Sequence, residues 1–196
     1  MGRPKEFDEH EALMKAMRLF WVHGYKATSI QDLVDGMGIG RGSLYGTFGG
    51  KRSLFMRALR YYDEERATYF TDLSTSKPPR QALLNAFESV ADTVLGHGSR
   101  DGCFLVNTAL ELSPHDAEIG SVVCDGFADA ESFFRNMIER GQASEEISGT
   151  VDANSTAHTL HTLLLGMLVL ARSRPEPMLL QGIVKQAGQL VPEPGL

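Results

Sequence analysis

The sequence is poor in the features that mark secreted, membrane-spanning and metal-binding proteins. Only two of its 196 residues are cysteines, Cys103 and Cys124, and their spacing is not that of a metal site. The longest strongly apolar stretch, residues 163–171, has nine residues, whereas a membrane-spanning helix needs about twenty. No apolar segment follows the basic residues near the N-terminus, as one would in a secretory signal. We therefore expect a cytoplasmic protein with free thiols, no membrane partner and no metal or other cofactor.

Sustained alternation of apolar and polar residues, which would indicate strands, is also absent. Hydrophobic residues make up 42% of the chain and charged residues 22%, as in a globular rather than a disordered protein. Apolar residues recur instead every three or four positions, which predicts helices throughout. Beyond residue 63 the expected helices cover 81–95, 103–112, 116–142, 154–172 and 178–191, with a proline-containing linker at 74–79.

The net charge of −6 hides a division between the two ends of the chain. Residues 1–60 carry a balance of +4, and residues 61–196 carry a balance of −10. A basic N-terminal third on an acidic remainder favours a polyanion-binding module joined to a part that does not bind polyanions. The overall acidity argues against a non-specific architectural DNA-binding protein, which would need more positive charge and show no preference for a palindrome.

The basic third contains four expected helices. A stripe that includes Leu13 and Phe20 predicts a first helix, which Gly24 ends. Residues 28–31 form an S/T-x-x-Q capping box with Thr28 as the N-cap of a short second helix. Glycines at 36–40 separate it from a third helix near 41–48, and Lys51 begins a fourth. Two short helices joined by a glycine-containing turn, after a longer supporting helix, are the architecture of a helix-turn-helix.

The spacing of many positions within residues 7–60 resembles the N-terminal pattern of the TetR (tetracycline-repressor-like) family. The most specific part is the string RGSLYGTFGGK at 41–51. Gly46 stands where the family commonly has an aromatic residue or histidine. The positions that carry the resemblance are Phe20, Gly24, Thr28, Ile30, Leu33, Gly38, Ile39, Ser43, Leu44, Tyr45, Phe48, Lys51 and Leu54.

The resemblance implies an all-α protein with two parts. Residues 1–60 would form a three-helix helix-turn-helix DNA-binding domain, and residues 61–196 a larger helical ligand-binding and dimerisation domain. The implied function is that of a one-component transcription regulator, a repressor that a small-molecule effector releases from a double-stranded palindromic operator. In a homodimer, the two recognition helices would meet half-sites about one DNA turn apart.

The second short helix would enter the major groove with its N-terminal end first. We therefore assign base contacts to Arg41, Gly42, Ser43 and Thr47. A guanidinium pairs bidentately with guanine, and hydroxyls pair with several bases. The glycines at 42 and 46 would keep this surface low, so that the backbone approaches the DNA closely.

Phosphate contacts are assigned to Thr28, Ser29, Tyr45 and Lys51. The resemblance implies this role for Thr28, Tyr45 and Lys51, and Ser29 shares the helix start with Thr28. Free backbone N–H groups at a helix N-terminus, with an ammonium nearby, suit a phosphate oxygen. Each of these residues also has a purely structural role open to it, as a cap or a packed ring. The basic segment 2–5 would either enter the minor groove or form a disordered end.

In the larger part, the family implies a dimer interface on two long helices, here 116–142 and 154–172. A stripe of small and apolar residues on the second of these helices either forms that interface or packs within one chain. Its members are Ala157, Leu160, Leu164, Gly166, Leu168 and Ala171. An effector pocket is expected to be mostly apolar with a few hydrogen-bonding groups. The candidate lining residues, each of which plain core packing would also explain, are Phe87, Val90, Val94, Cys103, Phe104, Asn107, Thr108, Phe127, Phe134 and Met137.

Cys103 supports two alternative hypotheses. It precedes a helix and lies near Arg100 in the sequence, and either feature lowers the pKa of a thiol, as in a redox or electrophile sensor. A buried structural cysteine is the other interpretation. A small helical enzyme that uses Cys103 with His115 or Glu111 is a further alternative, but the sequence shows no group placed to activate the thiol. The pair His158 and His161 lacks a third metal ligand.

Overall fold

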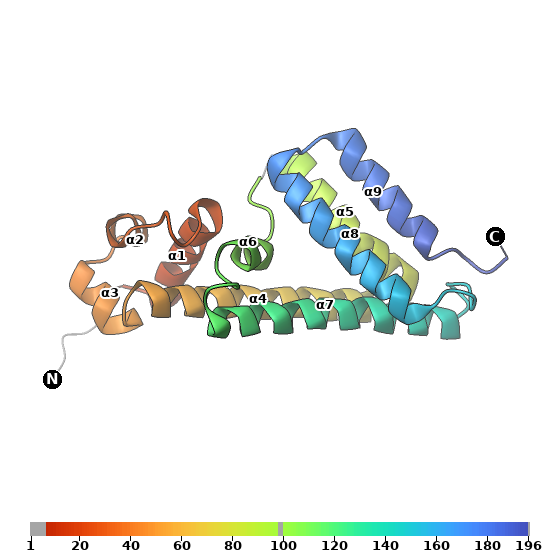
Figure 1. Ribbon diagram of the computed structural model, residues 1–196, viewed down its shortest axis with the longest axis horizontal. Helices are drawn as coiled ribbons and strands as arrows, with labels where there is room; N and C mark the ends of the chain where they lie inside the picture. Colours follow the sequence, from red (N-terminus) through yellow and green to blue (C-terminus); the bar gives the residue numbers. More distant parts are fainter. Residues whose placement is uncertain (1–6, 98–99, 196) are drawn as a thin grey trace.

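The computed structural model describes residues 7–97 and 100–195, and within these ranges every regular element is a helix (Figure 1). The prediction of an all-α fold is therefore confirmed. The basic segment 2–5 lies outside the described residues. Within the described part, no helix is long and apolar enough to cross a membrane.

The N-terminal helices are α1 (Glu9–His23), α2 (Ile30–Met37) and α3 (Arg41–Phe48). Gly24 ends α1 with a φ of 84°, and Gly38 and Gly49 end α2 and α3 in the left-handed conformation, at φ 71° and 76°. Side chains other than glycine rarely adopt these backbone angles, so the glycines fix where the helices stop.

The predicted capping box is wrong by one residue. The N-cap of α2 is Ser29, whose hydroxyl accepts from the N–H of Asp32, while the Asp32 carboxylate accepts from the N–H of Ser29. Thr28 instead is buried, and its hydroxyl donates to the carbonyl of Gly24 at 2.6 Å. Its side chain faces the end of α1, so it cannot also turn outward to cap α2.

The remaining helices are α4 (Lys51–Ser76), α5 (Pro79–His97), α6 (Phe104–Glu111), α7 (Ala117–Ala143), α8 (Ala153–Ser173) and α9 (Pro177–Leu190). Figure 1 shows α4 and α7 side by side along the molecule, with α1–α3 at one end and α5, α8 and α9 grouped at the other. The predicted domain boundary at residue 60 lies within α4, which continues into the expected linker at 74–79. One unbroken helix therefore joins the two parts.

Two hydrophobic clusters fill the interior. The first contains the inward faces of α1–α3, the first half of α4, the inward face of α6 and the start of α7. The second lies among α5, α8, α9 and the later parts of α4 and α7. Phe104 of α6 is central to the first cluster, with ring centroids 5.4 Å from Phe55 and 5.7 Å from Tyr62. Because α6 shares this core, the N-terminal helices pack on more than their own sixty residues.

Arg172, at the end of α8, binds the C-terminal end of α1. Its guanidinium donates to the carbonyls of Trp21 (3.2 Å), Val22 (3.1 Å) and Asp101 (2.9 Å). The first two carbonyls belong to the last turn of α1, which has no N–H partners within the helix. A positive charge there is also favoured by the helix dipole. The contact therefore replaces missing helical hydrogen bonds with a charged group from a distant helix.

A second contact of the same kind lies next to it. The carboxylate of Glu111, at the end of α6, accepts from the N–H groups of Tyr25 (2.9 Å) and Lys26 (2.7 Å) in the turn between α1 and α2. We call Arg172 and Glu111, with the backbone groups they bind, the α1 clamp. In addition to the shared core, it joins the N-terminal helices to α6 and α8 through one charged side chain from each of these two helices.

Replacing Arg172 with methionine tests the α1 clamp. Methionine keeps much of the volume but removes the charged donor from the carbonyls of Trp21, Val22 and Asp101, although the Asn107 amide still donates to those of Trp21 and Asp101. The free energy of unfolding should therefore fall by about 1.5–3 kcal/mol, the range for hydrogen bonds to a charged group. Arg174→Met is the matched control, because Arg174 is exposed and pairs only with Glu176; its cost should stay below about 1 kcal/mol. Urea unfolding measures both, and equal effects would show that the clamp does not stabilise the fold.

Candidate DNA-binding surface and effector pocket

The outward face of α3 carries the residues assigned to base contacts. Leu44 and Phe48 are buried beneath the helix, which fixes its orientation, and Arg41, Gly42 and Ser43 are exposed in its first turn. Thr47 follows one turn later and is half-buried. The structure therefore brings the four residues to one helix, with the first three fully accessible to a partner.

Two glycines of α3 have no role in the fold itself. A Cβ atom built on Gly42 or Gly46 would meet no atom within 4 Å, and neither residue has a positive φ. Glycine inside a helix costs about 1 kcal/mol relative to alanine. Within the described residues, the packing of the fold therefore does not account for glycine at these two positions.

The residues assigned to phosphate contacts do not all reach the surface. Tyr45 is 51% exposed, and Ser29 is exposed at the start of α2. Lys51 begins α4 and is half-buried, with its ammonium 4.3 Å from the ring centroid of Tyr25. Partial burial lowers the pKa of Lys51, and the charges of Glu111 and Asp32 oppose that shift. Thr28 is 1% exposed and hydrogen-bonded internally, so its hydroxyl is not presented to a phosphate.

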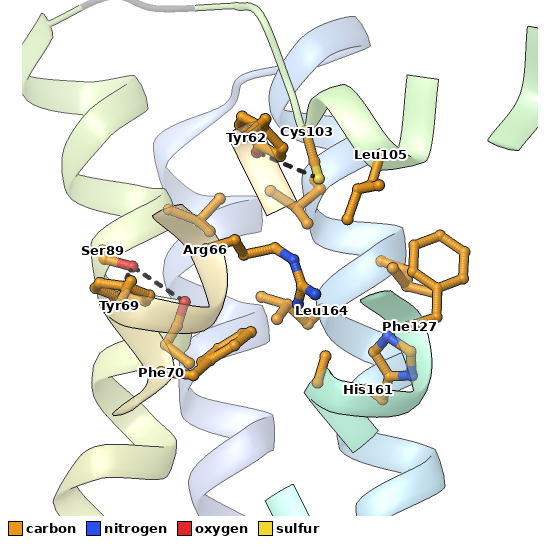
Figure 2. A pocket seen from close by; sticks show the side chains of 15 residues that line it. Tyr62, Arg66, Tyr69, Phe70, Ser89, Cys103, Leu105, Phe127, His161 and Leu164 are labelled. Atoms are coloured by element: carbon orange, nitrogen blue, oxygen red, sulfur yellow. Dashed lines mark hydrogen bonds between the residues drawn. The ribbon is translucent and has the colours of Figure 1, made fainter. Parts of the chain in front are cut away.

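A cavity of about 170 Å³ lies among α4, α5, α6, α7 and α8 (Figure 2). α3 is at the other end of the molecule from α5 and α8 (Figure 1). Of the ten residues predicted to line a pocket, Val90, Cys103 and Phe127 line this cavity. The other lining residues are Tyr62, Arg66, Tyr69, Phe70, Ala86, Ser89, Leu105, Ala130, His161, Leu164, Leu165 and Leu168. The lining is mostly apolar and aromatic, as is usual for a small-molecule site.

The other seven predicted pocket residues lie elsewhere. Phe87, Val94, Phe134 and Met137 belong to the core among α5, α7, α8 and α9. Phe104 is in the core of the N-terminal part. The Asn107 amide donates to the carbonyl of Asp101 at 3.0 Å, and Thr108 is 2% exposed. Their apolar or amphipathic spacing correctly indicated burial, but helical spacing alone does not indicate which buried face borders a cavity.

Sequence reasoning missed the polar residues of the cavity. Figure 2 shows Tyr69 paired with Ser89 on one side, and the Arg66 guanidinium reaching toward the middle. Arg66 donates to the Asp63 carboxylate at 2.7 Å and to the carbonyl of Gly126 at 2.6 Å. An arginine one turn after a tyrosine within a helix otherwise rich in exposed charges gives no sequence signal of an interior position.

Cys103 lies at the edge of the cavity, at the N-cap of α6. The Tyr62 hydroxyl donates to its sulfur at 3.4 Å (Figure 2). Burial raises the pKa of Tyr62 well above its ordinary value, and the adjacent Cys103 adds to the shift. Cys103 itself is 6% exposed, whereas Arg100 is exposed. This environment matches the buried structural cysteine of the two interpretations.

The histidines of α8 do not form a metal site. His158 pairs with Glu131 at 2.8 Å on the surface, whereas His161 is buried and lines the cavity beside Phe127. Within residues 7–97 and 100–195, no three His, Cys, Asp or Glu side chains are grouped as metal ligands.

The predicted dimer stripe on α8 is mostly internal. Ala157, Leu160, Leu164 and Ala171 are at most 6% exposed in the chain's own core, because they pack toward α5, α7 and α9. Gly166 is exposed, and it lines a surface groove with Leu163 and Leu170 of α8 and Ile183 of α9. The outward face of α8 therefore includes Leu163, Gly166 and Leu170, whereas Leu164 and Ala171 of the predicted stripe face the interior.

Known proteins resemble the chain over nearly its whole length. A family model described as bacterial regulatory proteins of the tetR family matches residues 12–58, and a tetracyclin repressor-like C-terminal domain model matches residues 79–186. The HTH-type transcriptional repressor ComR of Escherichia coli is 36% identical over 87% of this chain and 82% of its own length.

Solved structures agree with the family models. The TetR family transcriptional regulator CifR, a cysteine mutant in complex with 26-base-pair operator DNA, has a TM-score of 0.83 and 30% identity, over 97% of this chain and 100% of that one. Reduced NemR of E. coli has a TM-score of 0.86 at 18% identity, over 95% of this chain and 98% of that one, and supports the fold alone. The chain therefore belongs to the TetR family and is a DNA-binding transcriptional regulator, not an enzyme.

Proposed function

We propose that this chain is a repressor that binds a palindromic operator as a homodimer and releases it when a small molecule enters the cavity. The observation that carries the proposal is the outward face of α3, where Gly42 and Gly46 leave open space that the fold does not need. The relatives support it, since ComR is named a repressor and CifR is described in complex with operator DNA.

In this proposal residues 1–60 contact DNA and residues 61–196 respond to the effector. Arg41, Gly42, Ser43 and Thr47 face base edges, and the glycines at 42 and 46 let the α3 backbone approach the groove floor. Ser29, Tyr45 and Lys51 meet phosphates on either side. Thr28 supports this surface indirectly, because its bond to the Gly24 carbonyl holds the chain that presents Ser29.

Release follows from the position of the α1 clamp. Leu165 and Leu168 line the cavity on α8, and Arg172 lies one turn beyond Leu168 on the same helix. Displacement of α8 by a bound molecule changes the position of the Arg172 guanidinium against the end of α1. The distance between the two recognition helices of a dimer then changes. The operator fits only the distance found in the protein without effector.

The dimer is proposed to form through the outward face of α8 together with α9. Leu163, Gly166, Leu170 and Ile183 line an apolar groove there, and Val169 is 43% exposed beside it. A glycine in the middle of such a face lets two copies of a helix approach closely, as in a self-complementary two-fold contact. Homodimers are typical of the family.

Substitutions on the DNA-facing surface should separate affinity from specificity. Lys51→Gln should weaken binding to every DNA sequence and lower the slope of log affinity against log salt by about one.

Arg41→Ala should cost about 1–3 kcal/mol at the operator and relax the preference for one base. Fluorescence anisotropy against the DNA upstream of the gene measures both. Lys77→Gln, an exposed lysine at the far end of α4, is the control, and equal losses in all three variants would contradict the assigned roles.

Gly46→Ala should change stability and DNA affinity in opposite directions. The added Cβ meets nothing within the chain, so the free energy of unfolding should rise by roughly 0.5–1 kcal/mol. On DNA it occupies space next to the bases, and affinity should fall by roughly the tenfold that one mismatched base pair costs. Gly182→Ala on α9, also in open space, should stabilise the protein without changing DNA affinity. Unchanged affinity in Gly46→Ala would show that α3 does not approach DNA closely.

Gly166→Arg should convert the dimer to a monomer. A long charged side chain in the middle of the apolar groove prevents two α8 helices from approaching, and a Cβ at position 166 meets no described atom of its own chain within 4 Å. Thr68→Arg, at an exposed position of α4 outside both proposed interfaces, should remain dimeric. Light scattering after size exclusion gives the mass of each variant, and a dimeric Gly166→Arg protein would place the interface elsewhere.

A further inference from the structure

One polar atom of the cavity lacks a partner. Within the described residues, three buried side-chain atoms have no hydrogen bond: Oδ1 of Asn85, Oγ of Ser113 and Nε2 of His161. Of these residues only His161 lines the cavity, and its side chain is more than nine-tenths buried. Figure 2 shows its ring beneath Phe127 at one side of the cavity. A buried polar atom without a partner is costly, so its presence at a cavity wall indicates a ligand group.

The remaining polar groups of the wall are already paired. The Tyr62 hydroxyl donates to Cys103, and the Tyr69 hydroxyl donates to Ser89 at 2.8 Å. Arg66 is neutralised by the Asp63 carboxylate and also bound to the Gly126 carbonyl. These groups therefore shape the cavity, although Nη1 of Arg66 keeps N–H donors to spare. Within the described residues, Nε2 of His161 is the buried side-chain atom of the wall that has no hydrogen bond.

The cavity carries no uncompensated charge. Burial lowers the pKa of His161, the Glu131 carboxylate partly opposes that shift, and the positive charges of Arg66 and His158 add to it. The imidazole is therefore neutral at pH 7, and the one permanent cation is paired. A carboxylate or ammonium entering this space would lose its hydration without gaining a free counter-charge.

The size and lining set the body of the ligand. A cavity of roughly 150 Å³ lined by apolar side chains holds benzene, and the 170 Å³ here is slightly larger. The rings of Tyr62, Tyr69, Phe70 and Phe127 surround it, and aromatic edges and faces favour a ring between them. These dimensions suit a single ring with few substituents.

We propose that the cavity binds a small neutral ring compound with one hydroxyl, and that this hydroxyl pairs with Nε2 of His161. The inference rests on the proposed function, because it names the chemistry of the effector that function requires. A hydroxyl both donates and accepts, so it satisfies Nε2 in either tautomer of the imidazole, whereas a carbonyl satisfies only one.

The test compares three probes of one shape by calorimetric titration of the full chain. Phenol carries the hydroxyl, toluene replaces it with a methyl group, and benzoate carries a charge. Phenol should bind roughly three- to tenfold more tightly than toluene, which is the usual net effect of one neutral hydrogen bond. Benzoate should bind at least tenfold more weakly than phenol.

Two substitutions at one position test the role of His161. His161→Leu removes Nε2 and should make the affinities for phenol and toluene equal, while toluene still binds. His161→Gln restores an amide that both donates and accepts, and it should recover a preference for phenol. His115→Leu, the same change at an exposed histidine outside the cavity, should leave the preference unchanged.

Several outcomes would overturn the inference: no binding of phenol, equal binding of phenol and toluene to the unchanged chain, benzoate as the tightest probe, or a preference for phenol that survives His161→Leu. DNA binding is measured separately, without any probe. It shows whether only the proposed ligand class is wrong or whether the proposed function is wrong. A chain that binds operator but not phenol keeps its function and loses this ligand class. A chain that binds phenol with the His161 signature but no palindromic DNA keeps the ligand class and loses the function.

Discussion

The α1 clamp is the contact on which the rest of the arrangement depends. A helix end has unpaired carbonyls, and the turn that follows has unpaired N–H groups, so both need partners wherever they are partly buried. Arg172 supplies donors to the first, and Glu111 supplies acceptors to the second. The position of the N-terminal helices is thereby set by two side chains from α8 and α6.

This arrangement makes the N-terminal part mechanically dependent on the remainder. The hydrophobic core beneath α1 continues through Phe55 into Phe104 of α6, without an apolar gap at residue 60. α8 contributes to the cavity wall and to the clamp within a few residues of sequence. Under the proposed function, a ligand that widens the cavity would move α8, and α8 would carry Arg172 with it. The contact of Arg172 with the end of α1 would then change through one helix, without a flexible linker between them.

Periodicity predicted the helices well because each helix depends mainly on local sequence. α3 lies between the two glycines that cap it, as predicted. The observed ends of α7 and α8 each differ from the predicted ends by one residue. The capping box was placed one residue early because Thr28 and Ser29 are chemically similar, and only the tertiary position of Gly24 distinguishes them. The cavity was predicted poorly because helices far apart in sequence form it. Periodicity indicated that Phe87 and Phe134 are buried, but not that Arg66 and His161 face a common space.

The open face of α3 and the closed wall of the cavity have different consequences for how such a protein evolves. A Cβ at position 42 or 46 would meet no described atom of the chain within 4 Å, so an exchange there leaves the core as it is and, under the proposed function, would change only the surface that meets DNA. Residues such as Leu164 and Cys103 belong both to the cavity wall and to a hydrophobic core. If the chain works as proposed, a descendant lineage would acquire a new operator by single substitutions, whereas a new effector would require compensating changes in the interior.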